Sequence, residues 1–450
     1  MEKIKKLKKA LKRENIDGYI VPKNDEYFGE HVPDYNDRLR YISNFSGSFG
    51  FALVLKEKNY LFVDGRYTLQ AKNESGKNFR VITFHDNLPK KILKNKKLII
   101  GFDPKFLTRK TLSLYFANKN CSFKPIKNNL IDEIWKRKIR KDFGYFYRLP
   151  NESIGENYKI KVNKIIHYLK KHGADYLFIT ASENNAWLFN IRGFDAKFTP
   201  IPYSHAIINK NKEIQFFCDL KKISPVLKNQ FSLVKFIKKD LLDKNLLKIE
   251  KKKFILDKDT CSYHYENIIS KNNEILSLND PIYFLKAIKN NIEIQNIKKA
   301  HIYDGAALTK FLFWLKKNFY KKNITELSAS QKLYNLRKDN KKFKFLSFPT
   351  ISGSGPNGAI IHYNASKKSN RRLKKGDIYL VDSGGQYEFG TTDVTRTVSL
   401  ENSNKKIKDI FTRVLKGHIA VADFNLKENT TGSQIDIKAR KYLHEIGLDY

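Results

Sequence analysis

The feature that most constrains the fold is a pattern of helix, strand and hairpin that occurs twice in the first half of the chain. Each copy begins with apolar residues at helical spacing, continues with one apolar strand, and ends with two apolar strands around a polar turn. The expected strands are 16–21, 51–55 and 60–64 in the first copy, and 174–179, 205–208 and 214–219 in the second. A segment at 41–47 likewise matches one at 187–193. The repetition predicts two α/β domains of related design.

The pattern changes from about Asp280, after which apolar residues recur at helical spacing over a long segment. A second helix is expected at 326–337 and an irregular Gly-rich loop at 352–358, followed by strands at 359–363, 377–382 and 393–398 and by two helices. Hairpins in this order predict an α+β domain, unlike a doubly wound sheet. The basic run 136–141 and Leu149-Pro150 mark a boundary near residue 150. The predicted domains are 1–150, 151–285 and 286–450.

The chain is strongly basic, with 86 Lys and Arg against 46 Asp and Glu and a formal net charge of +40 at pH 7. The lysines lie in small scattered groups, so a solvated surface is favoured over a nucleic-acid interface. The N-terminus lacks a secretory apolar core, and the stretch 311–315 is far shorter than the roughly 18–20 apolar residues of a membrane span. Three widely separated cysteines fit a reducing compartment. We therefore expect a cytoplasmic protein with no membrane or nucleic-acid partner.

The segment 353–358 reads Gly-Ser-Gly-Pro-Asn-Gly and matches the G-x-G-x-x-G fingerprint of dinucleotide-binding folds. That fingerprint requires a helix directly after the glycines, whose N-terminus receives the pyrophosphate within a βαβ unit. Here an apolar run of β type follows at 359–363, and 364–376 is a short basic turn region without room for a crossover helix. The context therefore argues against a dinucleotide site.

Two aspartates in the stretch 379–397 are the best candidates for chemistry. Asp382 ends an apolar strand, where a carboxylate is costly unless it is paired, hydrogen-bonded or bound to a metal ion. Asp393 lies on the returning strand, so an antiparallel hairpin can bring the two carboxylates together. Because adjacent anions repel, a divalent cation between them would resolve the repulsion. The alternative is that one aspartate caps a turn and the other pairs with Arg396 at the surface.

This stretch, together with 348–363 before it, resembles the Xaa-Pro aminopeptidase (aminopeptidase P) family. The similarity continues in the same order through segments that span nearly the whole chain: 63–67, 186–193, 286–290, 300–305 and 414–421. The resemblance implies two related creatinase-like N-terminal α/β domains, followed by an α+β pita-bread metallopeptidase domain. It also implies a homodimer and peptide substrates with a penultimate proline.

The resemblance assigns roles to four residues. Asp382 matches a terminal carboxylate ligand and Asp393 a bridging carboxylate ligand of a centre with two metal ions, usually Mn²⁺, although Zn²⁺, Co²⁺ or Fe²⁺ are also open. His362 matches a histidine that contacts the substrate and assists catalysis. Arg66 matches an arginine of the substrate site. Without the resemblance, His362 would be interpreted as a packed histidine at a strand end and Arg66 as a solvated turn residue.

The implied reaction is hydrolysis, by metal-activated water, of the bond between an N-terminal residue and a following proline. Two alternatives stay open: a prolidase, which cleaves Xaa-Pro dipeptides in a similar fold, and a non-catalytic pita-bread module that binds protein or nucleic acid. The family's other ligands, one His and two Glu, lie C-terminal to the Asp393 segment and are missing from the 450 residues. The resemblance therefore leads us to expect only the first half of a pita-bread domain, inactive by itself.

Overall fold

A computed structural model describes residues 2–84, 87–94, 97–137, 144–401 and 403–450. These residues form two compact units. The first unit contains 1–309, 334–350 and 383–394, and the second contains 310–333, 351–382 and 395–450. Most of the basic run that was expected to mark a boundary near residue 150 falls in 138–143, outside the described residues.

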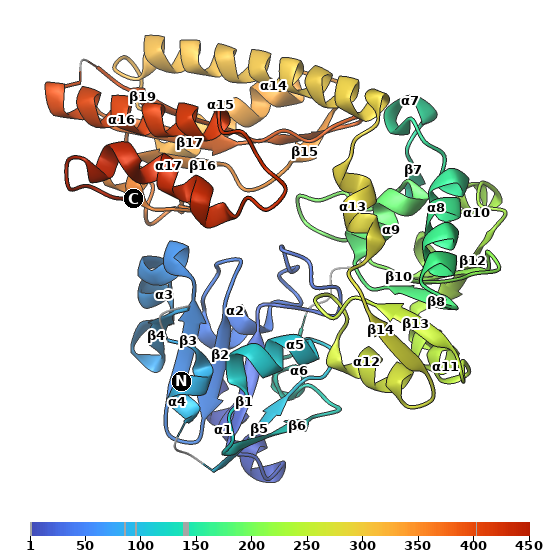
Figure 1. Cartoon of the computed structure of the whole chain (residues 1–450). Coiled ribbons are helices and arrows are strands. Elements are labelled where there is room, and N and C mark those ends of the chain that lie inside the picture. Colours follow the sequence, from blue (N-terminus) through green and yellow to red (C-terminus); the bar gives the residue numbers. More distant parts are fainter. Residues whose placement is uncertain (1, 85–86, 95–96, 138–143, 402) are drawn as a thin grey trace. The chain divides into compact units, whose positions relative to one another are not determined.

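The first repeat forms a six-stranded mixed sheet in the order β4-β3-β2-β1-β5-β6 (Figure 1). Its strands are β1 (Gly18–Pro22), β2 (Phe51–Leu55), β3 (Asn59–Val63), β4 (Arg80–Thr83), β5 (Leu98–Phe102) and β6 (Cys121–Pro125). The helices of this part are α1 (Glu2–Arg13), α2 (Arg38–Ser43), α3 (Thr68–Ser75), α4 (Pro89–Leu93), α5 (Arg109–Thr111) and α6 (Leu130–Ile134). Strand β1 pairs antiparallel with β2 and parallel with β5, so it joins a hairpin to a parallel half.

The first sheet is buried on both faces. Successive side chains of a strand point to opposite sides, so each face packs into its own set of core residues. Tyr19 and Val21 of β1 pack with Leu7 and Leu11 of α1 on one face. Ile20 packs with residues of β2, β3 and β5 on the other face. Burial on both sides explains why the strands are continuous apolar runs in the sequence.

The second repeat forms a six-stranded sheet in the order β12-β11-β10-β8-β13-β14. Its strands are β8 (Tyr176–Ile179), β10 (His205–Asn209), β11 (Ile214–Cys218), β12 (Val234–Lys238), β13 (Lys253–Leu256) and β14 (Glu274–Ser277). Its helices are α8 (Tyr158–Lys171), α9 (Ser182–Phe189), α10 (Pro225–Asn229), α11 (Leu242–Leu247), α12 (Tyr263–Ser270) and α13 (Pro281–Ala287). Beside it, α7 (Asn151–Ile154) follows a short antiparallel pair, β7 (Tyr147–Arg148) with β9 (Ile191–Arg192).

The remaining strands form two small sheets. Strand β15 (Phe343–Leu346) pairs antiparallel with β18 (Gly385–Tyr387). The other sheet has the order β16-β17-β19, with strands β16 (Ile351–Ser354), β17 (Ile378–Ser383) and β19 (Val394–Ser399). Strands β16 and β17 pair antiparallel. The α+β character expected for the last domain is therefore confirmed.

Four helices accompany these strands: α14 (Asn291–Asn318), α15 (Glu326–Lys338), α16 (Lys405–Ala422) and α17 (Gly432–His444). The last two lie side by side (Figure 1). Their backbones approach closely at Gly417, where a Cβ atom would lie 2.3 Å from the carbonyl oxygen of Ala439. In the part of the chain that the structure describes, no helix has both the length and the apolar character needed to cross a membrane.

The strand expected at 359–363 is wrong, as is the irregular loop expected at 352–358. Residues 352–354 belong to strand β16, and a 3₁₀ helix, η6 (Gly355–Ala359), follows and leads into a turn. Gly355 has a φ of +56°, a left-handed conformation that glycine adopts readily, and Pro356 lacks the N–H of a central strand residue. Ile361 is 58% exposed, so the apolar run does not enter a sheet.

Candidate functional site

Asp382 occupies the next-to-last position of β17, whose side chains alternate between a half-buried and a buried face. Tyr379 and Val381 are fully buried, and the Tyr379 hydroxyl lies 2.7 Å from the Ser352 hydroxyl of β16. Asp382 pairs in register with Ile351 and belongs to the half-buried face. The carboxylate therefore lies at the end of an apolar strand, as predicted, on the face opposite Tyr379 and Val381.

Asp393 lies directly before β19, which neighbours β17 in the three-stranded sheet. The preceding Thr392 is fixed by two hydrogen bonds: Ser347 Oγ donates to its carbonyl and the Gly385 N–H donates to its hydroxyl, each at 2.9 Å. Position 384 requires glycine, because a Cβ atom would lie 1.9 Å from the Thr392 carbonyl oxygen. The fold thus places Asp393 at the start of the strand that neighbours the strand of Asp382.

A buried ion pair in the first unit contacts the last residues of β17 and β18. The Arg337 guanidinium donates to both carboxylate oxygens of Asp304, at 2.6 and 2.9 Å, and to Ser383 Oγ at 3.0 Å. The Tyr387 hydroxyl donates to Asp304 at 2.9 Å. Arg337 is fully buried, and a buried arginine is stable only when charged and polar partners surround it. Sequence reasoning missed this network, because its members are spread from helix α14 to strand β18.

A buried carboxylate organises the loop that carries His362 in the second unit. Glu326 is fully buried and accepts hydrogen bonds from the Ser354 N–H, the Asn357 side-chain amide, the Tyr363 hydroxyl and the Arg371 N–H, at 2.8 to 3.0 Å. All four donors are neutral, and hydrogen bonds to a carboxylate are stronger than those between two neutral groups. Burial raises the pKa of Tyr363 to about 12, which keeps its hydroxyl a donor. Nothing in the spacing of these residues indicated the network.

His362 lies in the turn after η6, directly before Tyr363. Its φ of +55° is a left-handed conformation, which non-glycine residues adopt rarely and at some cost in free energy. The side chain is half-buried. The expected place at the end of a strand is therefore wrong, and a strained turn supported by the neighbouring Tyr363 holds the histidine instead.

Arg66 lies in a 3₁₀ turn, η1 (Gly65–Tyr67), directly after β3. Its guanidinium pairs with Asp64, with Nη2 2.6 Å from Oδ2, and lies 5.2 Å from the centre of the Tyr67 ring. The Arg66 side chain is 40% exposed. These contacts orient the guanidinium locally and leave part of it accessible.

The predicted metal ligands offer two carboxylates, and such oxygen donors suit Mn²⁺. Among the described residues, no three His, Cys, Asp or Glu side chains are grouped so that they could hold a metal ion. Arg396, the alternative surface partner of Asp393, donates from Nη1 to the carbonyl oxygen of Thr395 at 2.7 Å. Asp382 and Asp393 therefore fit a metal ion in donor type and supply part of the three protein ligands that catalytic sites commonly use.

Three family models match the chain in succession. Residues 3–134 and 141–293 each match the Creatinase/Prolidase N-terminal domain, and residues 295–450 match Metallopeptidase family M24. The double match to one N-terminal domain agrees with the two sheets of identical strand order.

Several proteins are similar over almost all of the chain. A probable Xaa-Pro aminopeptidase P of Laccaria bicolor is 33% identical over 100% of this chain and 72% of its own length. The Xaa-Pro aminopeptidase ApepP of Drosophila melanogaster is 34% identical over 97% of this chain and 73% of its own. Among solved structures, an X-prolyl aminopeptidase of Caenorhabditis elegans, described as cytosolic with a di-nuclear active site, has a TM-score of 0.93 at 30% identity. It covers 100% of this chain, which covers 78% of it.

A prolidase of Pyrococcus horikoshii is more distant. Its TM-score is 0.50 at 23% identity, over 64% of this chain and 78% of the prolidase. A likeness at this level of identity concerns the fold alone.

Proposed function

This chain belongs to the Xaa-Pro aminopeptidases of metallopeptidase family M24, and from that membership we propose that it removes the N-terminal residue from peptides whose second residue is proline. The observation that carries the proposal is similarity across the whole chain, with 33% identity to the fungal relative and a TM-score of 0.93 to the nematode enzyme. Prolidase is the weaker alternative, because the relatives named above that are at least 30% identical over nearly the whole chain are Xaa-Pro aminopeptidases. A non-catalytic binding module would suit the net charge of +40, but the lysines lie in small scattered groups.

The substrate bond sets the chemical requirement. An Xaa-Pro bond is a tertiary amide without an N–H, and the proline ring fixes φ, so a cleft that pairs with the backbone N–H of its substrate binds it badly. Hydrolysis of this bond needs an activated water, a polarised carbonyl and a hold on the free α-amine. These requirements suit a carboxylate-bound metal centre with adjacent polar residues.

We assign Asp382 and Asp393 as two ligands of a centre that holds two metal ions. The position of Asp382 in β17 and of Asp393 directly before the neighbouring strand β19 supports the assignment, as does the di-nuclear site of the nematode enzyme. Mn²⁺ is the metal ion we propose, because carboxylate donors favour it over ions that prefer sulfur ligands. Such ions, when bound, lower the pKa of water and polarise a carbonyl. The carboxylates of this chain contribute the negative charge and fixed geometry that retain them.

We assign substrate-binding roles to His362 and Arg66. The imidazole of a histidine holds or releases a proton near neutral pH, which suits a group that contacts a scissile amide and assists its cleavage. The strained turn at His362 supports this role, since such strain is concentrated at functional sites. Arg66 offers a guanidinium that Asp64 orients and that is still accessible to a substrate oxygen.

A comparison of three peptides tests the reaction against the expectation from the sequence that these 450 residues are inactive by themselves. That expectation holds if none of the three peptides is cleaved. With Mn²⁺ present, Ala-Pro-Phe should lose its alanine at least tenfold faster than Ala-Ala-Phe, because only the first has the proline-specific bond. The dipeptide Ala-Pro should also be cleaved more slowly than Ala-Pro-Phe. Faster cleavage of Ala-Pro would identify a prolidase, and equal rates for the two tripeptides would contradict the proposed specificity.

Metal binding tests the site independently of activity. The free Mn²⁺ signal in electron paramagnetic resonance should show that Asp382→Asn and Asp393→Asn each weaken Mn²⁺ binding by about tenfold or more, because each removes a charged ligand. Asp409→Asn is the matched control, since Asp409 is an exposed carboxylate paired with Arg413 at 3.0 Å on α16. The assignment fails if the control loses as much affinity as the two test variants, or if the test variants lose none.

We also propose a homodimer in the cytosol. The location is supported by the description of the nematode relative as a cytosolic enzyme. The dimer is taken from the family resemblance. Sedimentation equilibrium of the purified protein should give twice the 52.7 kDa mass of the chain, and a mass of one chain would contradict the dimer.

A further inference from the structure

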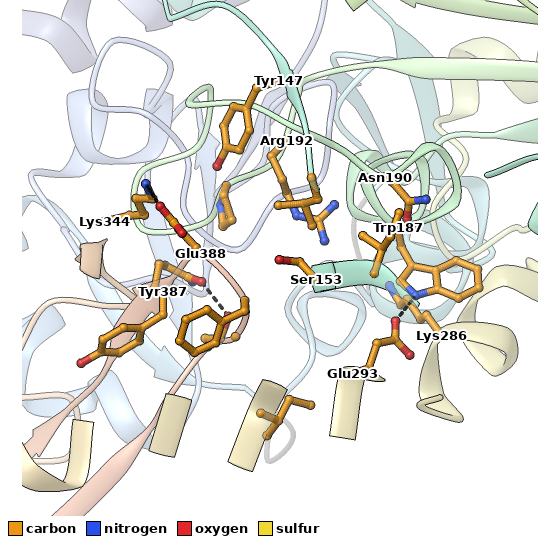
Figure 2. A pocket seen from close by; sticks show the side chains of 18 of the residues that line it. Tyr147, Ser153, Trp187, Asn190, Arg192, Lys286, Glu293, Lys344, Tyr387 and Glu388 are labelled. Atoms are coloured by element: carbon orange, nitrogen blue, oxygen red, sulfur yellow. Dashed lines mark hydrogen bonds and ion pairs between the residues drawn. The ribbon is translucent and has the colours of Figure 1, made fainter. Parts of the chain in front are cut away.

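A cavity of about 380 Å³ lies within the first unit, and the short β7–β9 pair contributes to its lining. Its lining comes from the helices α7, α8, α9, α13 and α14, the strands β7, β9 and β15, and the segment 386–391. Figure 2 shows Arg192 extending toward the middle of the cavity, with Trp187 on one side and Glu388 on the other. This volume is in the range of pockets that hold small organic molecules.

Basic side chains outnumber acidic ones in the lining. The five cations are Lys161, Arg192, Lys286, Lys289 and Lys344, and the two carboxylates are Glu293 and Glu388. Both carboxylates already have partners. Glu388 pairs with two lysines, Lys342 and Lys344, each at 2.8 Å. Glu293 accepts from Trp187 Nε1 at 3.2 Å and from the Asn290 N–H at 2.9 Å.

The other cations of the lining interact with neutral oxygens instead. Lys161 Nζ donates to the Trp187 carbonyl at 2.9 Å and to Asn190 Oδ1 at 2.7 Å. Arg192 Nη1 donates to the carbonyls of Ala186 and Ile191. Within the described residues, Lys161, Arg192, Lys286 and Lys289 form no ion pair. Burial lowers the pKa of Lys161 to about 8 and lowers that of Arg192, so both cations are poorly solvated.

Cations held in a cavity without carboxylate partners favour an anionic ligand, because an anion would compensate the loss of hydration. The rest of the lining indicates what the anion is attached to. Tyr147, Trp187, Phe345 and Phe389 contribute aromatic rings, and Leu149, Ile154 and Ile297 contribute aliphatic side chains. A bare inorganic ion would leave most of this apolar surface in contact with water.

We propose that this cavity binds a small organic anion, in which a carboxylate or phosphate group is carried on an apolar body of about the size of one aromatic ring. The oxyanion contacts Arg192 and the neighbouring lysines, and the ring lies among the aromatic side chains. Because 386–391 lines the cavity and leads directly to Asp393, the bound molecule also contacts the segment that carries this predicted metal ligand.

Isothermal titration calorimetry with simple probes tests the ligand class. Benzoate or phenyl phosphate should bind at least tenfold more tightly than neutral benzamide, which has the same ring without the charge. Tighter binding of benzoate identifies a carboxylate ligand, and tighter binding of phenyl phosphate identifies a phosphate ligand. Inorganic phosphate should bind more weakly than phenyl phosphate. Benzamide affinity equal to that of benzoate and phenyl phosphate would overturn the proposal.

Two variants locate the binding. Arg192→Met and Lys289→Met should each weaken binding of the better anion by about tenfold, because each removes one charged contact. Lys289 is exposed, so its substitution tests the charge even if Arg192→Met disturbs folding through its two carbonyl contacts. Lys235→Met, an exposed lysine on β12, is the control and should leave the affinity unchanged. Unchanged affinity in Lys289→Met, or an equal loss in Lys235→Met, would show that the cavity is not the binding site.

Discussion

The two N-terminal sheets are built in the same way from different residues. The six positions of one correspond in order to the six of the other, and every neighbouring pair has the same direction. The central strands correspond residue by residue, since Gly18 of β1 and Tyr176 of β8 each begin both ladders of their strand. Strand order is therefore maintained by the pattern of buried side chains rather than by their identity.

The correspondence extends to a contact between a helix and the next segment. Lys3 of α1 donates to the Tyr41 carbonyl at 2.9 Å, with its ammonium 4.6 Å from the Tyr41 ring centre. Lys161 of α8 donates to the Trp187 carbonyl at the same distance, with its ammonium 3.9 Å from the Trp187 ring centre. Lys3 is half-buried, whereas Lys161 is 1% exposed and lines the cavity. The same local contact thus has a different electrostatic environment in each copy.

The turn after the strand that pairs parallel with the central strand is also repeated. Asp103 follows β5 and accepts from the Lys105 N–H, and Asp257 follows β13 and accepts from the Asp259 N–H. The second oxygen of each aspartate accepts a hydrogen bond from the N-cap residue of a later helix, α6 in the first copy and α13 in the second. That capping residue is Asn129 in the first copy, where the side-chain amide donates, and Asp280 in the second, where the backbone N–H donates.

The copies differ most in what each buries beside its central strand. Lys23 follows β1 and forms a buried ion pair with Asp37, the residue that caps α2. The register-equivalent position after β8 is Ala181, which is buried without a charge. The comparison teaches that the shared sheet tolerates either a paired charge or none at this position, so each copy should respond differently to loss of a charge.

The largest expected effect is in the first copy. Lys23→Met leaves the Asp37 carboxylate buried without its cation, so local stability around β1 should fall by about 3–5 kcal/mol. Hydrogen exchange of the β1 and β2 amides, measured by mass spectrometry, reports this change. Lys56→Met removes an exposed pair with Asp17 in the same sheet and should cost less than about 1 kcal/mol. Equal losses of stability in the two variants would mean that the buried pair contributes no more than the exposed pair.

An intermediate effect is expected where the two capping residues differ. Asn129→Asp places a second carboxyl against Asp103, which the Asn129 amide contacts at 2.8 Å. Burial already raises the pKa of Asp103, and a neighbouring anion raises it further. Raised carboxyl pKa values mean that the native state binds more protons than the unfolded state, so the penalty grows as the pH rises from about 4.

The expected loss in Asn129→Asp is about 2–3 kcal/mol at pH 7 and close to zero at pH 4, measured by hydrogen exchange of the β5 amides. Asn129→Ser is the control, because serine also caps helices and brings no charge. A pH-independent loss in the aspartate variant would point to lost packing instead of charge repulsion.

The smallest change in stability is expected for Lys161, the lysine that corresponds to Lys3 of the first copy. Lys161→Met loses two hydrogen bonds but also removes a buried charge, so at pH 7 the two changes should cancel to within about 1 kcal/mol.

Burial lowers the pKa of Lys161 to about 8, so the unfolded state binds more protons than the native state above that pH. Wild-type stability at this site should therefore rise with pH from about 8 toward the unfolded lysine pKa of about 10.4.

Urea unfolding followed by Trp187 fluorescence, with Trp135 and Trp314 replaced by Phe, measures that pH dependence. Lys161→Met should abolish the rise in unfolding free energy between pH 7.5 and 9.5. The matched variant Lys3→Met should retain it, because Lys3 is only half-buried. Loss of the rise in both variants, or in neither, would show that the different burial of the two lysines has no electrostatic consequence.

The sequence predicted the repeated sheets well, because burial on both faces gives each strand an apolar run that is visible without a structure. The helices at 326–337 and near the C-terminus were also predicted correctly. The strand at 359–363 was wrong, since a similar apolar run there follows Gly355 and Pro356 and stays partly exposed. The domain boundaries at 150 and 285 stay predictions.

The candidate site was predicted in part. Asp382 was predicted because a carboxylate ends an apolar strand, and Asp393 because it lies on the returning strand. The sheet has β17 and β19 as neighbours. The roles of these two aspartates, and those of His362 and Arg66, stay proposals. The Arg337–Asp304 pair gave no sequence signal, because its partners lie on separate helices and each alone resembles an ordinary surface charge.

The sequence by itself determined which segments are strands and helices, that they occur in two related sets, and which two carboxylates lie at strand ends. Only the tertiary structure decided the environment of the polar groups: a full burial of Glu326 among four neutral donors, a left-handed turn at His362, and a buried ammonium at Lys161 that donates to neutral oxygens. Periodicity is a local property of the chain, whereas burial and hydrogen bonding depend on residues tens of positions away, which only folding brings into contact.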